Sequence, residues 1–149
     1  MAVVRIFSDL HFWDSHLRNR ISFVEESKDL GRRILTMVKD DRKTYKGQKY
    51  YVIFGGDTFH RDSKSSEMSS WWTQFFLEIR ALCNGIFFTV GNHELTYPNE
   101  NVFWSLVNEI EANSLRYANN YARGRLPIGR IVDRIEIEGI EFHFVHYNV

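Results

Sequence analysis

The sequence is short of cysteine, proline and net charge. Its one cysteine, Cys83, cannot form an internal disulfide and is too few thiols for a zinc site, which favours a reducing, cytoplasmic location. Only 2 prolines occur among 149 residues and no Gly/Ser-rich linker interrupts them, so a single domain over residues 1–149 is expected. The 19 basic residues balance the 19 acidic ones, which excludes a strongly basic nucleic-acid module as the whole protein.

Long apolar runs and targeting segments are also missing. No stretch approaches the ~18 apolar residues of a membrane span, so no membrane partner is expected. Residues 1–7 lack the charged start and cleavage site of a signal peptide. There is no Gly-x-x-x-x-Gly-Lys loop, which excludes ATP hydrolysis by that route. Aromatic residues make up 15% of the chain, enough for a sizeable core.

Short apolar runs predict strands that alternate with helices. The β-branched and aromatic runs predict strands over residues 3–7, 50–54 and 86–90. Apolar residues at helical spacing predict helices over residues 22–39, 67–82 and 101–112, with a polar loop over 40–49. Alternation around Ile131 to Ile137, a Glu138-Gly139 turn and residues 140–147 predict a hairpin. The expected class is α/β, a mixed sheet with βαβ units flanked by helices and ending in a β-hairpin.

Each of the first three predicted strands is followed by polar residues of metal-binding types. The three motifs are Asp9-Leu10-His11, Gly56-Asp57 and Gly91-Asn92-His93-Glu94. The carboxyl ends of parallel strands meet at one edge of a sheet, so the motifs are expected to converge there. Their carboxylate, imidazole and amide groups suit Mn²⁺, Fe²⁺ or Zn²⁺. Each motif alone is more often a turn or a cap; the ordered set favours a metal site.

The ordered motifs resemble those of the calcineurin-like metallophosphoesterase superfamily, which run D-x-H, G-D, G-N-H-[D/E] and then a histidine at a strand end, here His146. The resemblance spans nearly the whole chain. It implies hydrolysis of phosphate esters with two divalent ions, most readily Mn²⁺, with Fe²⁺ or Zn²⁺ as alternatives. The implied metal ligands are Asp9 and His11 for the first ion, Asp57 as the bridge, and Asn92 and His146 for the second.

The resemblance further implies roles for two residues that do not bind metal. His93 would face the phosphate and stabilise the transition state or protonate the leaving oxygen. Glu94 would orient His93. A water or hydroxide held between the two ions would be the nucleophile, because metal binding lowers its pKa.

The chain departs from the family pattern at its end. No Gly-His-x-His follows before Val149, although that motif supplies one ligand to each ion in the family. The expectation is therefore the N-terminal part of a metallophosphoesterase fold, truncated before the last motif. A fragment is favoured because the earlier motifs are intact. Ligands from a partner chain, or a weak or inactive domain, are the alternatives.

The stretch Gly56-Asp57-Thr58-Phe59-His60 is similar to the G-D-x-F-H of double-strand-break repair nucleases of the SbcD type. This similarity implies DNA as the substrate, a contribution of His60 to nuclease action and an ATPase partner. Arg61 is the candidate substrate-binding residue beside the site. Other basic residues could contact phosphates or be ordinary solvated surface, namely Arg42, Lys43, Lys46, Lys49, Arg123, Arg125 and Arg130.

Three alternatives remain open at this point. His60 could be an ordinary loop histidine, and the substrate could be a small phosphate ester or a nucleotide instead of DNA. The chain could also be a non-catalytic scaffold that uses the same fold to bind proteins. His143, which alternates with His146, is predicted to be structural or exposed.

Overall fold

The computed structural model describes residues 1–12, 23–58, 66–89, 91, 95–97, 100–101, 130–131 and 134–145. The elements in chain order are β1 (Ala2–Ser8), α1 (Phe23–Thr44), β2 (Lys49–Gly55), α2 (Ser66–Leu82), β3 (Gly85–Thr89), β4 (Leu95–Tyr97), β5 (Glu100–Asn101), β6 (Arg130–Ile131), β7 (Arg134–Ile137) and β8 (Ile140–His143). In the described part of the chain, no helix combines the length and apolarity of a membrane span.

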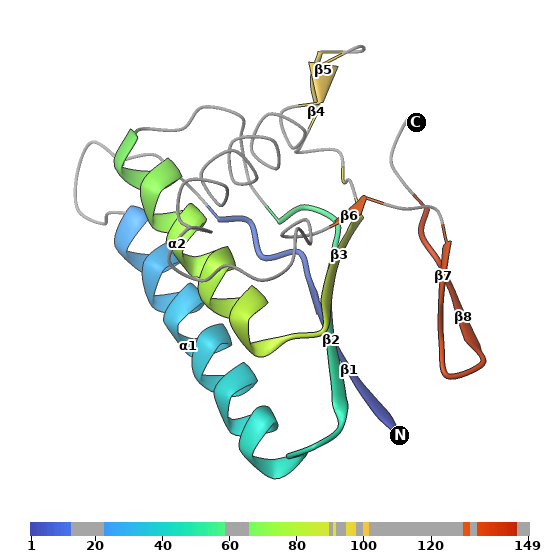
Figure 1. Ribbon diagram of the computed structural model, residues 1–149. Coiled ribbons are helices and arrows are strands. Elements are labelled where there is room, and N and C mark those ends of the chain that lie inside the picture. The colour runs from blue at the N-terminus through green and yellow to red at the C-terminus, as the bar shows by residue number, and fades with distance from the viewer. Residues whose placement is uncertain are drawn as a thin grey trace, which may run out of the picture.

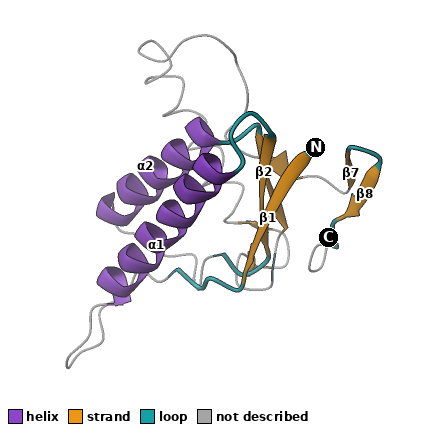
Figure 2. Ribbon diagram, turned by 90° about the horizontal axis from the view of Figure 1, so that it is seen from below, coloured by secondary structure: helices purple, strands orange, loops and turns teal. Residues whose placement is uncertain are grey.

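The main sheet has four strands in the order β1-β2-β3-β6, and each neighbouring pair is parallel. Ser8 pairs with Gly55 and Gly55 with Thr89, so the first three strands end level with one another. Both helices lie on one side of this sheet, and the antiparallel hairpin β7–β8 lies on the other (Figures 1 and 2). The predicted α/β class, its parallel strands and the closing hairpin around Glu138-Gly139 are confirmed.

The core lies between the sheet and the two helices. Residues at helical spacing face the sheet from each helix, namely Val24, Ile34 and Val38 of α1 and Trp72, Phe75, Phe76 and Ile79 of α2. Phe54 of β2 stacks on Phe88 of β3 with ring centroids 5.3 Å apart. Phe76 meets both rings edge-on at 5.4 and 5.5 Å. Such edge-on contacts add to the stabilisation from apolar burial.

Gly31 has a packing reason for its place inside α1. A Cβ at this position would overlap the Trp71 ring of α2, so the missing side chain lets the two helices approach each other. The helix propensity lost at a glycine is about 1 kcal/mol. The close contact with Trp71 offsets part of that cost.

Helix α1 is longer than the sequence predicts. The loop predicted over residues 40–49 is wrong for residues 40–44, because α1 continues to Thr44. The apolar stripe of α1 ends at Val38, and Asp41 takes the next position toward the sheet. Its carboxylate accepts hydrogen bonds from Arg5 of β1 at 2.7 and 2.8 Å and from the Tyr50 hydroxyl of β2 at 2.6 Å. Asp41 therefore makes a polar contact at a position where the helical pattern would require an apolar residue, so the pattern does not extend the predicted helix to this turn.

The C-terminal elements also differ from the prediction in detail. The alternation over residues 131–137 predicts one strand, whereas Ile131 belongs to β6, which pairs with β3, and β7 begins separately at Arg134. Asn101 lies in β5, so the helix predicted over residues 101–112 does not begin there. The rest of that range lies outside the described residues.

The contact of Arg5, Asp41 and Tyr50 joins β1, α1 and β2 at the amino ends of the strands. The Tyr50 side chain is fully buried, and that of Asp41 is 13% exposed. Burial and the hydrogen bond to Asp41 both raise the pKa of Tyr50 above its usual value. Burial alone would raise the pKa of Asp41, but hydrogen bonds from Tyr50 and Arg5 and the charge of Arg5 outweigh it and lower that pKa. Asp41 is therefore ionised in the folded protein at neutral pH.

We expect Asp41→Asn to lower the free energy of unfolding by about 1.5–3 kcal/mol at pH 7, because hydrogen bonds to a charged group are lost. Ionised Asp41 stabilises the fold above about pH 4, and this stabilisation is lost as the pH falls through its lower folded pKa. The gap between wild type and variant should therefore close in acid, measured by urea unfolding.

The matched control is Asp40→Asn, one residue away. The Asp40 side chain is 68% exposed and lies 3.9 Å from the Lys43 ammonium. A surface pair of this kind contributes about 0–1 kcal/mol. Equal losses in the two variants would contradict the stabilising role of the buried contact.

Candidate metal centre

The segments that follow β1 and β2 run side by side beyond the sheet. Three backbone hydrogen bonds join them: Asp9 N donates to Gly56 O at 3.2 Å, His11 N to Asp57 O at 2.9 Å and Phe12 N to Thr58 O at 2.9 Å. The parallel pairing thus continues past the ends of both strands. These backbone bonds hold Asp9 and His11 opposite Asp57.

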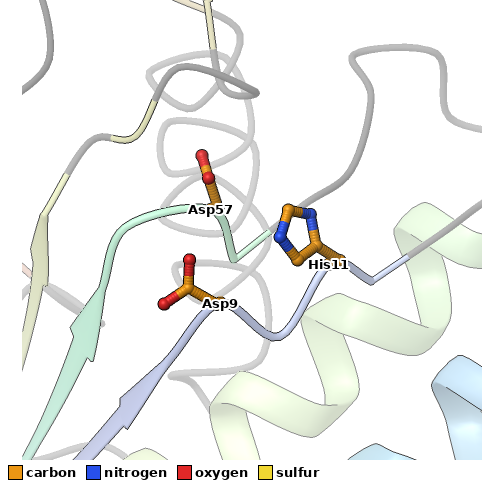
Figure 3. Close-up of side chains that lie close together, drawn as sticks. All are labelled: Asp9, His11 and Asp57. Atoms are coloured by element: carbon orange, nitrogen blue, oxygen red, sulfur yellow. The ribbon is translucent and has the colours of Figure 1, made fainter.

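The side chains of Asp9, His11 and Asp57 come together at this edge. Each offers one oxygen or nitrogen ligand atom, and these atoms lie within 4.8 Å of one another. Figure 3 shows the three side chains beyond the ends of β1 and β2, with one oxygen of Asp9 turned toward Asp57. Asp9 is exposed, and the other two are half-buried. The predicted convergence of the first two motifs is therefore found in the structure.

All three residues have a left-handed backbone, with φ of 53° at Asp9, 47° at His11 and 48° at Asp57. This region is uncommon for residues other than glycine and is populated mainly by Asn, Asp and His. Such conformations cost roughly 1–3 kcal/mol each and cluster at functional sites. The described residues contain only one other non-glycine case, Glu138, in the turn of the hairpin.

The third motif reaches the same place through Gly91. A Cβ on Gly91 would overlap the Oδ1 and backbone nitrogen of Asp57 and lie 2.8 Å from its Cγ. Gly56 has a φ of 57°, and its backbone nitrogen donates to Thr89 O at 3.1 Å. Gly56 thus allows the sharp turn after β2, and Gly91 allows the close approach of the third motif to Asp57.

Two buried side chains that anchor these segments are not predicted from the sequence. Phe12, directly after His11, is fully buried and meets the Phe75 ring edge-on at 5.7 Å. Thr58, directly after Asp57, is 1% exposed. A large aromatic residue next to a polar motif is the signal that could have identified Phe12 as an anchor.

The other predicted site residues lie outside the described part of the chain. They are Asn92, His93, Glu94, His146, His60 and Arg61. His143 is described, and its side chain is 65% exposed and lies 2.9 Å from Glu141, in line with its predicted surface position.

The basic residues at the end of α1 and the start of β2 lie away from the cluster. Lys49 begins β2 and Gly55 ends it, which separates them by roughly 20 Å at the rise of a strand. Arg42 donates to Gln48 O at 2.8 Å and stands over the Tyr50 ring. This group of cations is therefore at the opposite edge of the sheet from Asp9, His11 and Asp57.

Cys83 is not a nucleophile of this site. It packs against the core at the end of α2, and burial raises the pKa of its thiol to about 12. A thiol with so high a pKa carries almost no thiolate at neutral pH.

Comparison with known families gives the class of the protein. Residues 2–148 match the calcineurin-like phosphoesterases, and the chain belongs to that family. No curated protein matches the chain.

The donor set of the cluster suits a divalent metal ion. Carboxylate and imidazole groups are ligands that Mn²⁺, Fe²⁺ and Zn²⁺ accept. The family and the Asp9–His11–Asp57 cluster together support metal-dependent hydrolysis of phosphate esters.

We expect Gly91→Ala to lower the free energy of unfolding of the metal-free protein by about 1–3 kcal/mol, because the added methyl group displaces Asp57. Gly85→Ala is the matched control at the other end of β3, where a Cβ would come no closer than 3.3 Å to side-chain carbons. Its cost should stay below about 1 kcal/mol in urea unfolding. Equal costs would argue against the contact of Gly91 with Asp57.

Proposed function

We propose that the protein hydrolyses phosphodiester bonds of DNA with two divalent cations, most readily Mn²⁺. The observation that carries the proposal is the convergence of Asp9, His11 and Asp57 within 4.8 Å, on left-handed backbone, in a calcineurin-like phosphoesterase. The bound cations would supply positive charge at the phosphate and a water of lowered pKa.

The residues of the chain would divide the work as follows. Asp9 and His11 would hold one cation, and Asp57, with two carboxylate oxygens, would reach both. Asn92 directly follows Gly91, whose backbone is in contact with Asp57, which supports its assignment to the same centre. We propose that Asn92 and His146 bind the second cation.

The imidazole of His93 would donate a proton to the leaving oxygen, with Glu94 orienting the ring. Removing His93 should therefore affect turnover more than cation binding. His93 stands two residues after Gly91 in the chain, which supports its assignment to the same site.

The preference for DNA rests on the sequence from Gly56 to His60 and on Arg61 next to it. We propose that His60 acts on polynucleotide substrates and that Arg61 contacts a substrate phosphate. An ATPase partner is part of the same proposal. Because Lys49 and its basic neighbours lie at the opposite edge of the sheet, phosphate contacts near the cluster would have to come from other residues.

The metal-binding step is tested by thermal unfolding with increasing Mn²⁺ after treatment with EDTA. A cation at 100 times its Kd stabilises the folded state by about 2.7 kcal/mol, so the midpoint of the wild type should rise. Asp57→Asn should lose most of that rise. In EDTA the variant should be at least as stable as wild type, because Asn tolerates the left-handed backbone and no longer repels Asp9.

Glu136→Gln is the matched control, because Glu136 is an exposed carboxylate of β7 outside the cluster. It should keep the full response to Mn²⁺. A wild-type protein whose midpoint does not respond to Mn²⁺, Fe²⁺ or Zn²⁺ would sink the metal-dependent function and favour the non-catalytic scaffold.

The substrate class is tested separately with His60→Ala. We expect this variant to lose Mn²⁺-dependent cleavage of DNA while it still hydrolyses a nitrophenyl phosphate ester, because the small ester needs only the metal centre. His143→Ala, on the exposed face of the hairpin, should keep both activities. Parallel loss of both activities in His60→Ala would remove the special nuclease role, and activity on the ester alone in wild type would favour a small-molecule phosphatase.

A further inference from the structure

Ser8, the last residue of β1, contacts one of the proposed metal ligands. Its hydroxyl oxygen lies 2.5 Å from Oδ2 of Asp9 and 2.6 Å from the backbone carbonyl oxygen of Gly55 at the end of β2. Ser8 and Gly55 are register partners in the sheet, so the hydroxyl stands between the carboxylate and the neighbouring strand. The Ser8 hydroxyl therefore has two oxygen acceptors within hydrogen-bond distance.

The hydroxyl has a single hydrogen and therefore donates to one of these two acceptors at a time. A bond from a hydroxyl to an ionised carboxylate is typically about 2.5–2.7 Å long and stronger than one to a neutral carbonyl. The short distance to Oδ2 indicates that the Ser8 hydroxyl donates to the Asp9 carboxylate. The other carboxylate oxygen remains available for a cation.

Asp9 needs such a contact more than its neighbours do. It is the exposed member of the cluster, whereas His11 and Asp57 are half-buried. An exposed carboxylate rotates freely about its terminal bond unless a partner holds it. Carboxylates that bind a metal ion in general also accept a hydrogen bond from a neighbouring group, and removal of that group lowers the affinity for the metal.

We propose that Ser8 is a positioning residue that fixes the rotation of the Asp9 carboxylate, so that one oxygen faces His11 and Asp57 while the other accepts the Ser8 hydrogen bond. The proposal rests on the metal-dependent function above and assigns one more residue to the same site. It predicts an effect on cation affinity without an effect on the metal-free fold.

The test is calorimetric titration of the full chain with Mn²⁺. Ser8→Ala should weaken the binding of the cation by about 10–100-fold. Ser8→Thr, which keeps a hydroxyl on Cβ, should restore most of the affinity. In EDTA the thermal midpoint of Ser8→Ala should match that of wild type, because changes at exposed positions shift stability by no more than about 0.5 kcal/mol.

Thr36→Ala is the matched control. Thr36 also donates a hydroxyl to a carbonyl oxygen, that of Arg32 at 3.0 Å, but on the exposed side of α1. It should bind Mn²⁺ as wild type does. Unchanged affinity in Ser8→Ala, or a Ser8→Thr variant as weak as Ser8→Ala, would overturn the role of Ser8 while wild-type binding upholds the metal site. Absence of binding in wild type would overturn the metal site itself.

Discussion

Three backbone hydrogen bonds continue the pairing of β1 and β2 past the ends of both strands, and the candidate site depends on them. They bring Asp9 and His11 opposite Asp57. Because backbone groups make these bonds, the placement survives changes of side-chain identity that leave the chain path intact. Phe12 and Thr58, which are buried directly after His11 and Asp57, anchor the two segments in the interior.

The two edges of the sheet have different tasks. Toward the amino ends, the contact of Arg5, Asp41 and Tyr50 joins two strands and a helix. At the carboxyl ends, three residues occupy left-handed backbone and two carboxylates lie close together. Each of these features destabilises the fold without a cation. The stabilising contact and the left-handed backbone therefore lie in different parts of the sheet.

The positions of the first three strands and the meeting of the first two motifs could be predicted from the sequence, because apolar runs mark buried strands and parallel strands end at one edge. The end of α1 could not, since Asp41 is held by partners distant in sequence. The left-handed conformations and the contacts of Ser8 could not be predicted either. Both depend on how two chain segments meet, which no pattern within either segment encodes.

The left-handed backbone of Asp9, His11 and Asp57 limits how this cluster could be transferred to another protein. Copying the side chains of Asp9, His11 and Asp57 onto another βαβ scaffold would place them on right-handed or extended backbone, where their Cβ atoms aim elsewhere. A graft would have to include both segments that follow β1 and β2. It would also need the buried Phe12, which anchors the first segment, and Gly91, which lies against the second. The backbone conformation of these segments must therefore be transferred together with the three side chains.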